Sequence, residues 1–254
     1  MSAPRATVVL VHGPWLGPWI WHAHLLPRLE ALGMRCFAPD LHEAWPRPDW
    51  SPAVARLRLD EYVARLHAFV AGLRGPVVLI GHSLGARVVE GLIERRAPAG
   101  AVLIAPVPPS GLEAEARALA ARHPADAAAA LLARRPLRLL GDPSRPDPAR
   151  VRELLLGPRA SAALAAEVAA RLRDEPFAAC LEWLRPRPVP PPGARPPVLA
   201  LGGRDDPLVT PAALRRAGAA WDATVHALPH AGHCPMLGDA APALARRIED
   251  WLSG

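Results

Sequence analysis

The sequence contains no lysine, so all 30 of its basic residues are arginine, and it has a single tyrosine. Its three cysteines, Cys36, Cys180 and Cys234, are odd in number and form no Cys-x-x-Cys pair, which argues against a disulfide framework or a cysteine-based metal or redox site. No apolar run is long enough to cross a membrane, and no secretory signal precedes the first expected strand. These absences predict a cytoplasmic protein with reduced thiols and no membrane partner.

The net charge of +6 has no matching cluster of arginine and aromatic residues, because the arginines are scattered along predicted helices. We therefore interpret the excess as biased composition and expect no nucleic-acid partner. A chain of 254 residues, 51% hydrophobic, is large enough for one α/β domain, or for a core domain with a smaller insertion.

Strand-like and helix-like segments alternate along both ends of the chain. Continuous apolar strands separated by helices are typical of a parallel sheet covered on both faces. The expected strands are residues 7–11, 35–38, 77–80, 101–104, 198–201 and 224–228. The expected helices are residues 19–32, 52–73, 86–96, 211–221 and 240–252.

The middle of the chain has a different pattern. Residues 107–192 are rich in alanine, leucine and arginine, contain no convincing strand and are interrupted by prolines. We predict a core of residues 1–106 and 193–254 and a helical insertion of residues 107–192, and we expect a stiff, proline-rich linker at 186–197. Open sheets bind ligands at the carboxyl ends of their strands, so the insertion is expected to cover the site as a lid. Its leucines are expected to form either an apolar underside or a core between its own helices.

One serine has the surroundings that a nucleophile needs. The segment GHSLG at 81–85 directly follows the strand at 77–80 and directly precedes a helix. A serine there sits in a sharp turn that exposes its oxygen, and the two glycines relieve crowding where strand and helix nearly touch. The segment predicts that Ser83 is a catalytic nucleophile.

A serine nucleophile needs a base, and the base needs an orienting acid. Asp205 and Asp206 follow the strand at 198–201, and His230 and His233 follow the last strand. Because the carboxyl ends of parallel strands share an edge, either aspartate and either histidine can approach the serine.

These segments, with HG at 12–13, GGRDDPLV at 202–209 and AGHCP at 231–235, resemble the α/β-hydrolase superfamily over nearly the whole chain. The resemblance implies an α/β-hydrolase fold: a mostly parallel sheet of about six strands, flanked by helices, with an inserted helical lid. It implies Ser83, Asp206 and His233 as the catalytic triad, because the acid usually lies three residues after the glycine of a G-x-x-D turn and the histidine usually follows a glycine. It implies no cofactor and no metal.

The segment HGPWLGPWIW at 12–21 is similar to that of plant methylesterases, hydroxynitrile lyases and their bacterial relatives. The lyases of that group use a lysine beside the triad, and this chain has none, so the esterase branch is the better match. Trp19 and Trp21 are expected in the core, whereas Trp15 fits either the core or a pocket wall.

The resemblance also implies two backbone N–H donors for the oxyanion of a tetrahedral intermediate. One is Leu84, after the nucleophile. The usual second position is Pro14, which has no N–H, so we expect the N–H of Trp15 to take its place.

Four residues are candidates for a substrate pocket: His12, Trp15, His82 and Leu208. For His12 a role in bracing the HG loop is an alternative, and His42 is expected to be a solvated loop residue.

The predicted function is hydrolysis of a carboxylic ester or thioester of a small, apolar molecule through an acyl-enzyme. The alternatives are thioester release, C–C hydrolysis or a cofactor-free lyase or cyclase step on the same triad, and a small-molecule-binding protein that does not turn its ligand over. The oligomeric state is left open.

Overall fold

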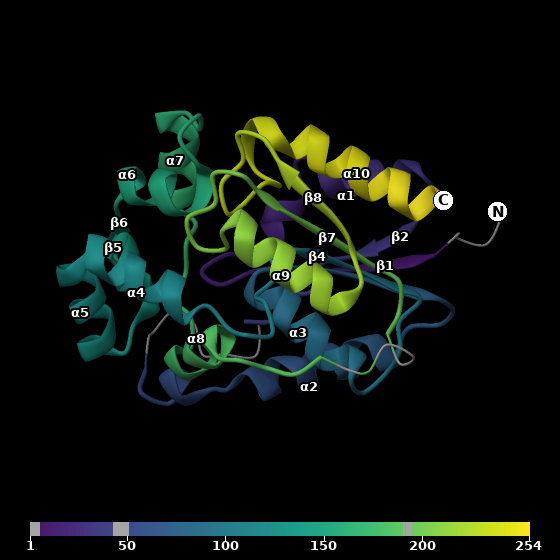
Figure 1. Cartoon of the computed structure of the whole chain (residues 1–254), viewed down its shortest axis with the longest axis horizontal. Coiled ribbons are helices and arrows are strands. Elements are labelled where there is room, and N and C mark those ends of the chain that lie inside the picture. Colours follow the sequence, from purple (N-terminus) through teal and green to yellow (C-terminus); the bar gives the residue numbers. More distant parts are fainter. Residues whose placement is uncertain (1–5, 43–50, 190, 192–194) are drawn as a thin grey trace.

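The fold comes from a computed structural model that describes residues 6–42, 51–189, 191 and 195–254. Its centre is a six-stranded sheet in the order β2-β1-β3-β4-β7-β8, parallel throughout (Figure 1). The strands are β1 (Thr7–Val11), β2 (Arg35–Phe37), β3 (Val77–His82), β4 (Gly100–Ile104), β7 (Val198–Gly203) and β8 (Thr224–Leu228). The predicted α/β fold with about six parallel strands is confirmed.

Apolar clusters lie on both faces of the sheet. Because successive side chains of a strand point to opposite sides, each strand contributes to both clusters. Val8 and Leu10 of β1 belong to an apolar cluster on the face that carries the first and last helices, whereas Val9 and Val11 belong to a second cluster on the other face. Figure 1 shows the first face covered by α1 (Leu25–Ala31) and α10 (Ala241–Ser253), and the second by α2 (Leu59–Ala71) and α3 (Leu84–Ile93). Helix α9 (Pro211–Trp221) packs on β7 and β8.

Two of the expected helices are interrupted. The expected helix at 19–32 is a 3-10 turn, η1 (Pro18–Trp21), followed by α1. The expected helix at 52–73 is a 3-10 turn, η2 (Val54–Arg56), followed by α2, because Leu57 and Arg58 are extended and end the first turn. Among the described helices, none combines the length and apolar character that a membrane span requires.

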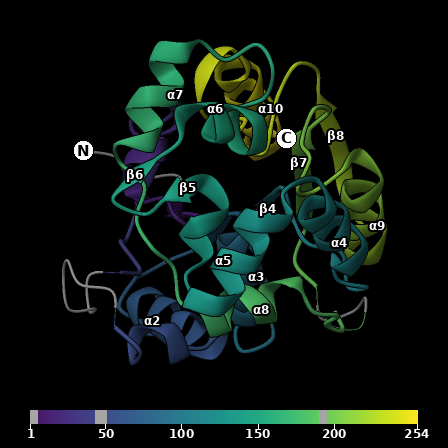
Figure 2. The ribbon, with the colours of Figure 1, turned by 90° about the vertical axis from the view of Figure 1, so that its left-hand side faces the viewer.

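The chain between β4 and β7, which we call the lid, lies at one end of the sheet and faces the viewer in Figure 2. It contains α4 (Glu113–Arg122), α5 (Pro124–Ala133), η3 (Pro136–Leu140), α6 (Pro148–Val151), the π-helical η4 (Arg152–Leu156), α7 (Ala162–Ala169) and α8 (Phe177–Leu184). The expectation of an entirely helical lid is wrong in one place: β5 (Gly141–Asp142) pairs with β6 (Arg145–Pro146). The Asp142 carboxylate accepts the N–H and hydroxyl of Ser144, which closes that turn.

The predicted boundary between lid and core at 192–193 lies outside the described residues, as does part of the expected linker at 186–197.

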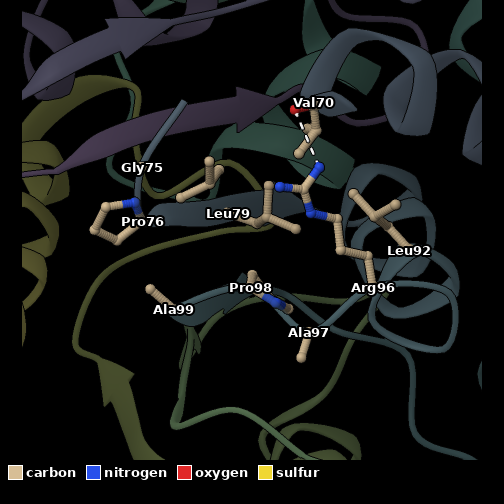
Figure 3. Close-up of a pocket in the computed structure, with 10 residues that line it drawn as sticks. Val70, Gly75, Pro76, Leu79, Leu92, Arg96, Ala97, Pro98 and Ala99 are labelled. Atoms are coloured by element: carbon tan, nitrogen blue, oxygen red, sulfur yellow. Dashed lines mark hydrogen bonds between the residues drawn. The ribbon is translucent and has the colours of Figure 1, made fainter. Parts of the chain in front are cut away.

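The carboxyl ends of the strands meet at one edge. Val11 is opposite Gly81, His82 is opposite Ile104, and Gly203 is opposite Leu228. The loops that follow β1, β3, β7 and β8 therefore begin side by side. The opposite edge carries a pocket of about 90 Å³, where Arg96 donates to the carbonyl of Val70 (Figure 3), and none of the residues predicted to act chemically line it.

Candidate active site

Three side chains from three loops at the carboxyl edge form a continuous chain of hydrogen bonds. The Nε2 atom of His233 lies 2.8 Å from the Ser83 hydroxyl oxygen, and its Nδ1 atom lies 2.9 Å from Oδ2 of Asp206. The other Asp206 oxygen accepts the N–H groups of Leu208 and Val209 at 2.8 and 2.9 Å. The carboxylate is thus fixed by its own loop, and it orients the imidazole toward the serine.

The alternative acid and base of the sequence analysis lie elsewhere. Asp205 is exposed, and its N–H donates to the carbonyl of Ala231. His230 is also exposed and has a left-handed backbone with φ of +59°. The structure therefore brings together Ser83, Asp206 and His233, the set that the resemblance favoured.

The local fold around Ser83 has the form expected of a nucleophile elbow. Ser83 joins β3 to α3 with φ of +56° and ψ of −115°, a strained combination for a residue with a side chain. A Cβ atom on Gly81 would lie 2.6 Å from the carbonyl oxygen of Gly85, and one on Gly85 would strike the carbonyl groups of Val11 and His12. The two glycines therefore let strand, helix and the loop after β1 cross at close range.

Leu84 is the first residue of α3, so its N–H has no acceptor one turn earlier within the helix. This N–H and the positive end of the α3 dipole are available to a negative oxygen near Ser83.

The structure does not support Trp15 as the second oxyanion donor. Its N–H donates to Oε2 of Glu175 at 3.0 Å, and its carbonyl accepts the N–H of Arg173 at 2.9 Å. The Trp15 amide is thus engaged by the lid, and Pro14 still offers no N–H in the position that normally supplies one.

Glu175 is a buried lid carboxylate that the sequence analysis missed. Besides the Trp15 N–H, it accepts the Tyr62 hydroxyl, and both its oxygens lie 3.1 Å from Nε2 of His42. Burial alone would lower the pKa of His42, but the charge and hydrogen bonds of Glu175 and Asp40 outweigh it and raise that pKa. No motif marks a glutamate in the lid, so only the folded chain reveals these contacts.

The same region contains the one group of described residues whose donor atoms lie close enough to hold a metal ion, His12, Asp40 and His42. Burial works to raise the pKa of Asp40, but hydrogen bonds from His42 and from Arg173 hold it below its usual range. The Arg173 guanidinium meets the two Asp40 oxygens at 2.9 and 3.1 Å. A bound cation would face this guanidinium, so the geometry favours a structural network over a metal centre.

An apolar pocket of about 340 Å³ lies between the lid and the core, and Leu208, two residues after Asp206, is part of its lining. Trp15 and Leu208 line it, as predicted, whereas His12 and His82 do not. The lid supplies the other lining side chains, mainly from α4, α5 and α8, and they include Leu119, Leu131, Leu139, Phe177, Leu181 and Trp183. The apolar underside expected of the lid is present.

His12 and His82 are buried parts of the scaffold. The Nδ1–H of His12 donates to the carbonyl of Gly13, and its Nε2 accepts the N–H of Leu41. His82 lies against Gly13 and donates from Nε2 to the backbone carbonyl of His233 at 2.9 Å. Burial lowers the pKa of both side chains, and the nearby His233 lowers that of His82 further.

Comparison with known proteins agrees with this geometry. A model of the alpha/beta hydrolase family matches residues 8–247. No curated protein matches the sequence. The match confirms the superfamily resemblance that was stated from the GHSLG and AGHCP segments.

Solved structures with a similar fold include several esterases. A thermophilic esterase from Thermogutta terrifontis is 21% identical with a TM-score of 0.70, covering 99% of this chain and 91% of its own. A methylesterase from Arabidopsis is 19% identical with a TM-score of 0.65, covering 98% and 99%. A pyrethroid hydrolase from Sphingobium faniae is 22% identical with a TM-score of 0.64, covering 98% of each chain. At these identities the likeness shows a shared fold.

The buried, neutral His82 predicts a loss of stability in acid. Its pKa in the folded protein is lower than its unfolded value of about 6.5, so the unfolded chain binds this proton first as the pH falls. The contribution is intact above pH 6.5 and declines below it, by on the order of 1–2 kcal/mol at pH 5. Urea unfolding of wild type and His82→Gln at pH 7.5 and pH 5 measures it. The wild type should lose more stability between the two, and equal losses would contradict the assignment.

Proposed function

The chain belongs to the alpha/beta hydrolase family, and from that premise we propose that it is a serine hydrolase that cleaves carboxylic esters through an acyl-enzyme on Ser83. The observation that carries the proposal is the hydrogen-bond chain from Ser83 through His233 to Asp206. The esterases among the proteins of similar fold support it.

In the proposed mechanism, Ser83 attacks the carbonyl carbon of the ester while His233 Nε2 takes the hydroxyl proton. Asp206 holds Nδ1–H and stabilises the imidazolium that forms. His233 then returns the proton to the leaving alcohol as the tetrahedral intermediate collapses to the acyl-enzyme. A water molecule, deprotonated by the same histidine, attacks the acyl carbon and releases the acid.

The oxyanion of both intermediates would be held by the N–H of Leu84 at the start of α3. With Pro14 lacking an N–H and the Trp15 amide bonded to Glu175, a second donor at the usual position is missing. Loss of one oxyanion donor typically costs on the order of a hundred- to a thousandfold in rate. We therefore expect slow turnover. The same observation favours a second candidate, a small-molecule-binding protein with negligible turnover.

The apolar pocket favours a neutral substrate. The side chains around it are mainly leucine, alanine and aromatic groups, and its two charged lining residues, Glu115 and Arg117, are already paired with Arg216 and Glu113. An ionised group placed against the apolar wall would lose its hydration. A volume of about 340 Å³ is at the small end of ligand pockets, which suits a compact apolar acyl or alkyl group.

Replacement of Ser83 by alanine is expected to abolish both ester turnover and labelling by a fluorophosphonate. Gel fluorescence of the labelled protein and p-nitrophenyl ester assays measure the two effects. Ser161→Ala, which removes the N-cap hydroxyl of α7 on the surface of the lid, is the control and should behave like wild type. Full labelling of Ser83→Ala would refute the nucleophile, and stoichiometric labelling of wild type without ester turnover would favour the binding protein.

Asp205 and Asp206 are adjacent, so the same substitution at each position tests which of them is the catalytic acid. Asp206→Asn should lower kcat on the order of ten-thousandfold, because an amide at this position favours the wrong tautomer of His233. Asp205→Asn carries the same change one residue earlier on an exposed side chain and should leave kcat nearly unchanged. Steady-state kinetics on one ester decides between them. Equal effects, or a larger effect at Asp205, would overturn the proposed acid.

Matched esters test the substrate preference. The p-nitrophenyl ester of butyric acid should have a kcat/KM at least about a hundredfold above that of the p-nitrophenyl monoester of succinic acid, because the second carboxylate resists burial. Comparable values for the two would show that the apolar pocket does not take the acyl group.

A further inference from the structure

Ser83 is sealed off in this structure. Its exposed fraction is 0% and that of His233 is 1%. None of the triad residues lines the apolar pocket, although Leu208, two residues after Asp206, and Trp15, two residues after Gly13, do. A molecule that occupies the pocket therefore cannot touch the Ser83 oxygen until a side chain between them moves.

Trp15 and Leu208 are the candidates for that side chain, because they are the pocket-lining residues that belong to core loops at the carboxyl edge. Trp15 follows Gly13 by two residues, and Gly13 packs against His82, the neighbour of Ser83 in the chain. Both side chains are nearly buried, and the Trp15 indole is much the larger of the two.

The backbone of Trp15 is held from both sides by the lid. Arg173 donates its N–H to the Trp15 carbonyl, and Glu175 accepts the Trp15 N–H. The Arg173 guanidinium also donates to the carbonyl of Leu16 at 3.2 Å, and it is itself fixed by Asp40. These contacts keep Trp15 at φ of +64°, where a residue with a side chain is strained.

The indole, in contrast, has no polar anchor. Its Nε1–H is buried and has no hydrogen-bond partner among the described residues. Rotation of the ring would therefore break apolar packing but no hydrogen bond, while the clamped backbone stays in place. The pocket offers the ring apolar surroundings on the side away from the core.

We propose that the indole of Trp15 is a gate between the apolar pocket and Ser83, and that it determines which apolar esters reach the nucleophile. The inference rests on the proposed function, since it assumes that Ser83 attacks the substrate. A substrate whose apolar group displaces the indole gains access to the serine oxygen. Glu175 and Arg173 are positioning residues that act through Trp15.

The test compares the rate at which Ser83 is labelled by two alkyl fluorophosphonates, one with a methyl and one with an octyl chain. Trp15→Gly removes the gate, and glycine tolerates φ of +64° without strain. We expect its second-order labelling rate constant to rise severalfold over wild type with both probes, and more with the octyl probe than with the methyl probe. Trp19→Gly is the matched control, because Trp19 lies a few residues later, stacks on Arg171 and does not line the pocket.

Each outcome decides the proposal. A severalfold rise in Trp15→Gly with wild-type rates in Trp19→Gly supports the gate. An unchanged or lower rate in folded Trp15→Gly, with labelling still abolished by Ser83→Ala, overturns the gate and leaves the nucleophile intact. If Ser83 is labelled in neither wild type nor Trp15→Gly, the nucleophile is wrong and the gate with it.

A second variant covers the case in which Trp15→Gly does not fold. Trp15→Phe keeps an aromatic ring but loses part of its area, so its labelling rate constant should rise above that of wild type. Its kcat/KM for p-nitrophenyl octanoate should rise more than for the acetate. A uniform change across both esters would contradict a gate and indicate a general effect on the loop.

Discussion

His233 hydrogen-bonds in two directions, to Ser83 and to Asp206, and this requires three loops from β3, β7 and β8 to meet within hydrogen-bond distance. Parallel strands in register provide this, because their carboxyl ends stop at one edge. The burial of β3 and β7 on both faces favours that register, since a one-residue slip would send each side chain into the opposite apolar cluster, whose packing it does not match. The site thus depends on the packing of the whole sheet rather than on any one loop.

The lid supports two of the loops at this edge. The carbonyl of Leu155, in its π-helical turn, accepts the N–H of Cys234 at 2.7 Å, directly after the histidine. A Cβ atom on Gly232 would strike the backbone at Leu156 and Gly157, so that glycine permits the close approach. On the other side Glu175 holds the Trp15 loop. Because every one of these contacts involves the lid, its packing and the geometry of the site are coupled.

The elbow, the acid and the histidine could be located from sequence because each belongs to a short local pattern beside a strand. The prediction that the Trp15 N–H holds the oxyanion is not supported, because this N–H donates to Glu175. That residue lies 160 positions away in an alanine-rich segment with no motif. His12 and His82 were placed in the pocket for a similar reason, since adjacency in sequence to Gly13 and Ser83 does not reveal which side the imidazole faces. The short strands β5 and β6 could not be predicted from the sequence, because two-residue strands leave no periodic pattern.

The residues that act on the Ser83 hydroxyl differ from those that hold Trp15. The hydrogen bonds to His233 and the start of α3 act on the Ser83 oxygen, and none of them passes through the lid. The contacts of Arg173 and Glu175 hold the backbone of Trp15, which lines the pocket. The buried Glu175 has three kinds of donor around it, an amide, a hydroxyl and an imidazole, so it is satisfied without water and has little reason to release Trp15. Because the Trp15 backbone is held firmly, rotation of its side chain costs less free energy than movement of the loop. In the proposed gate, the size of the Trp15 indole therefore determines which substrates reach Ser83.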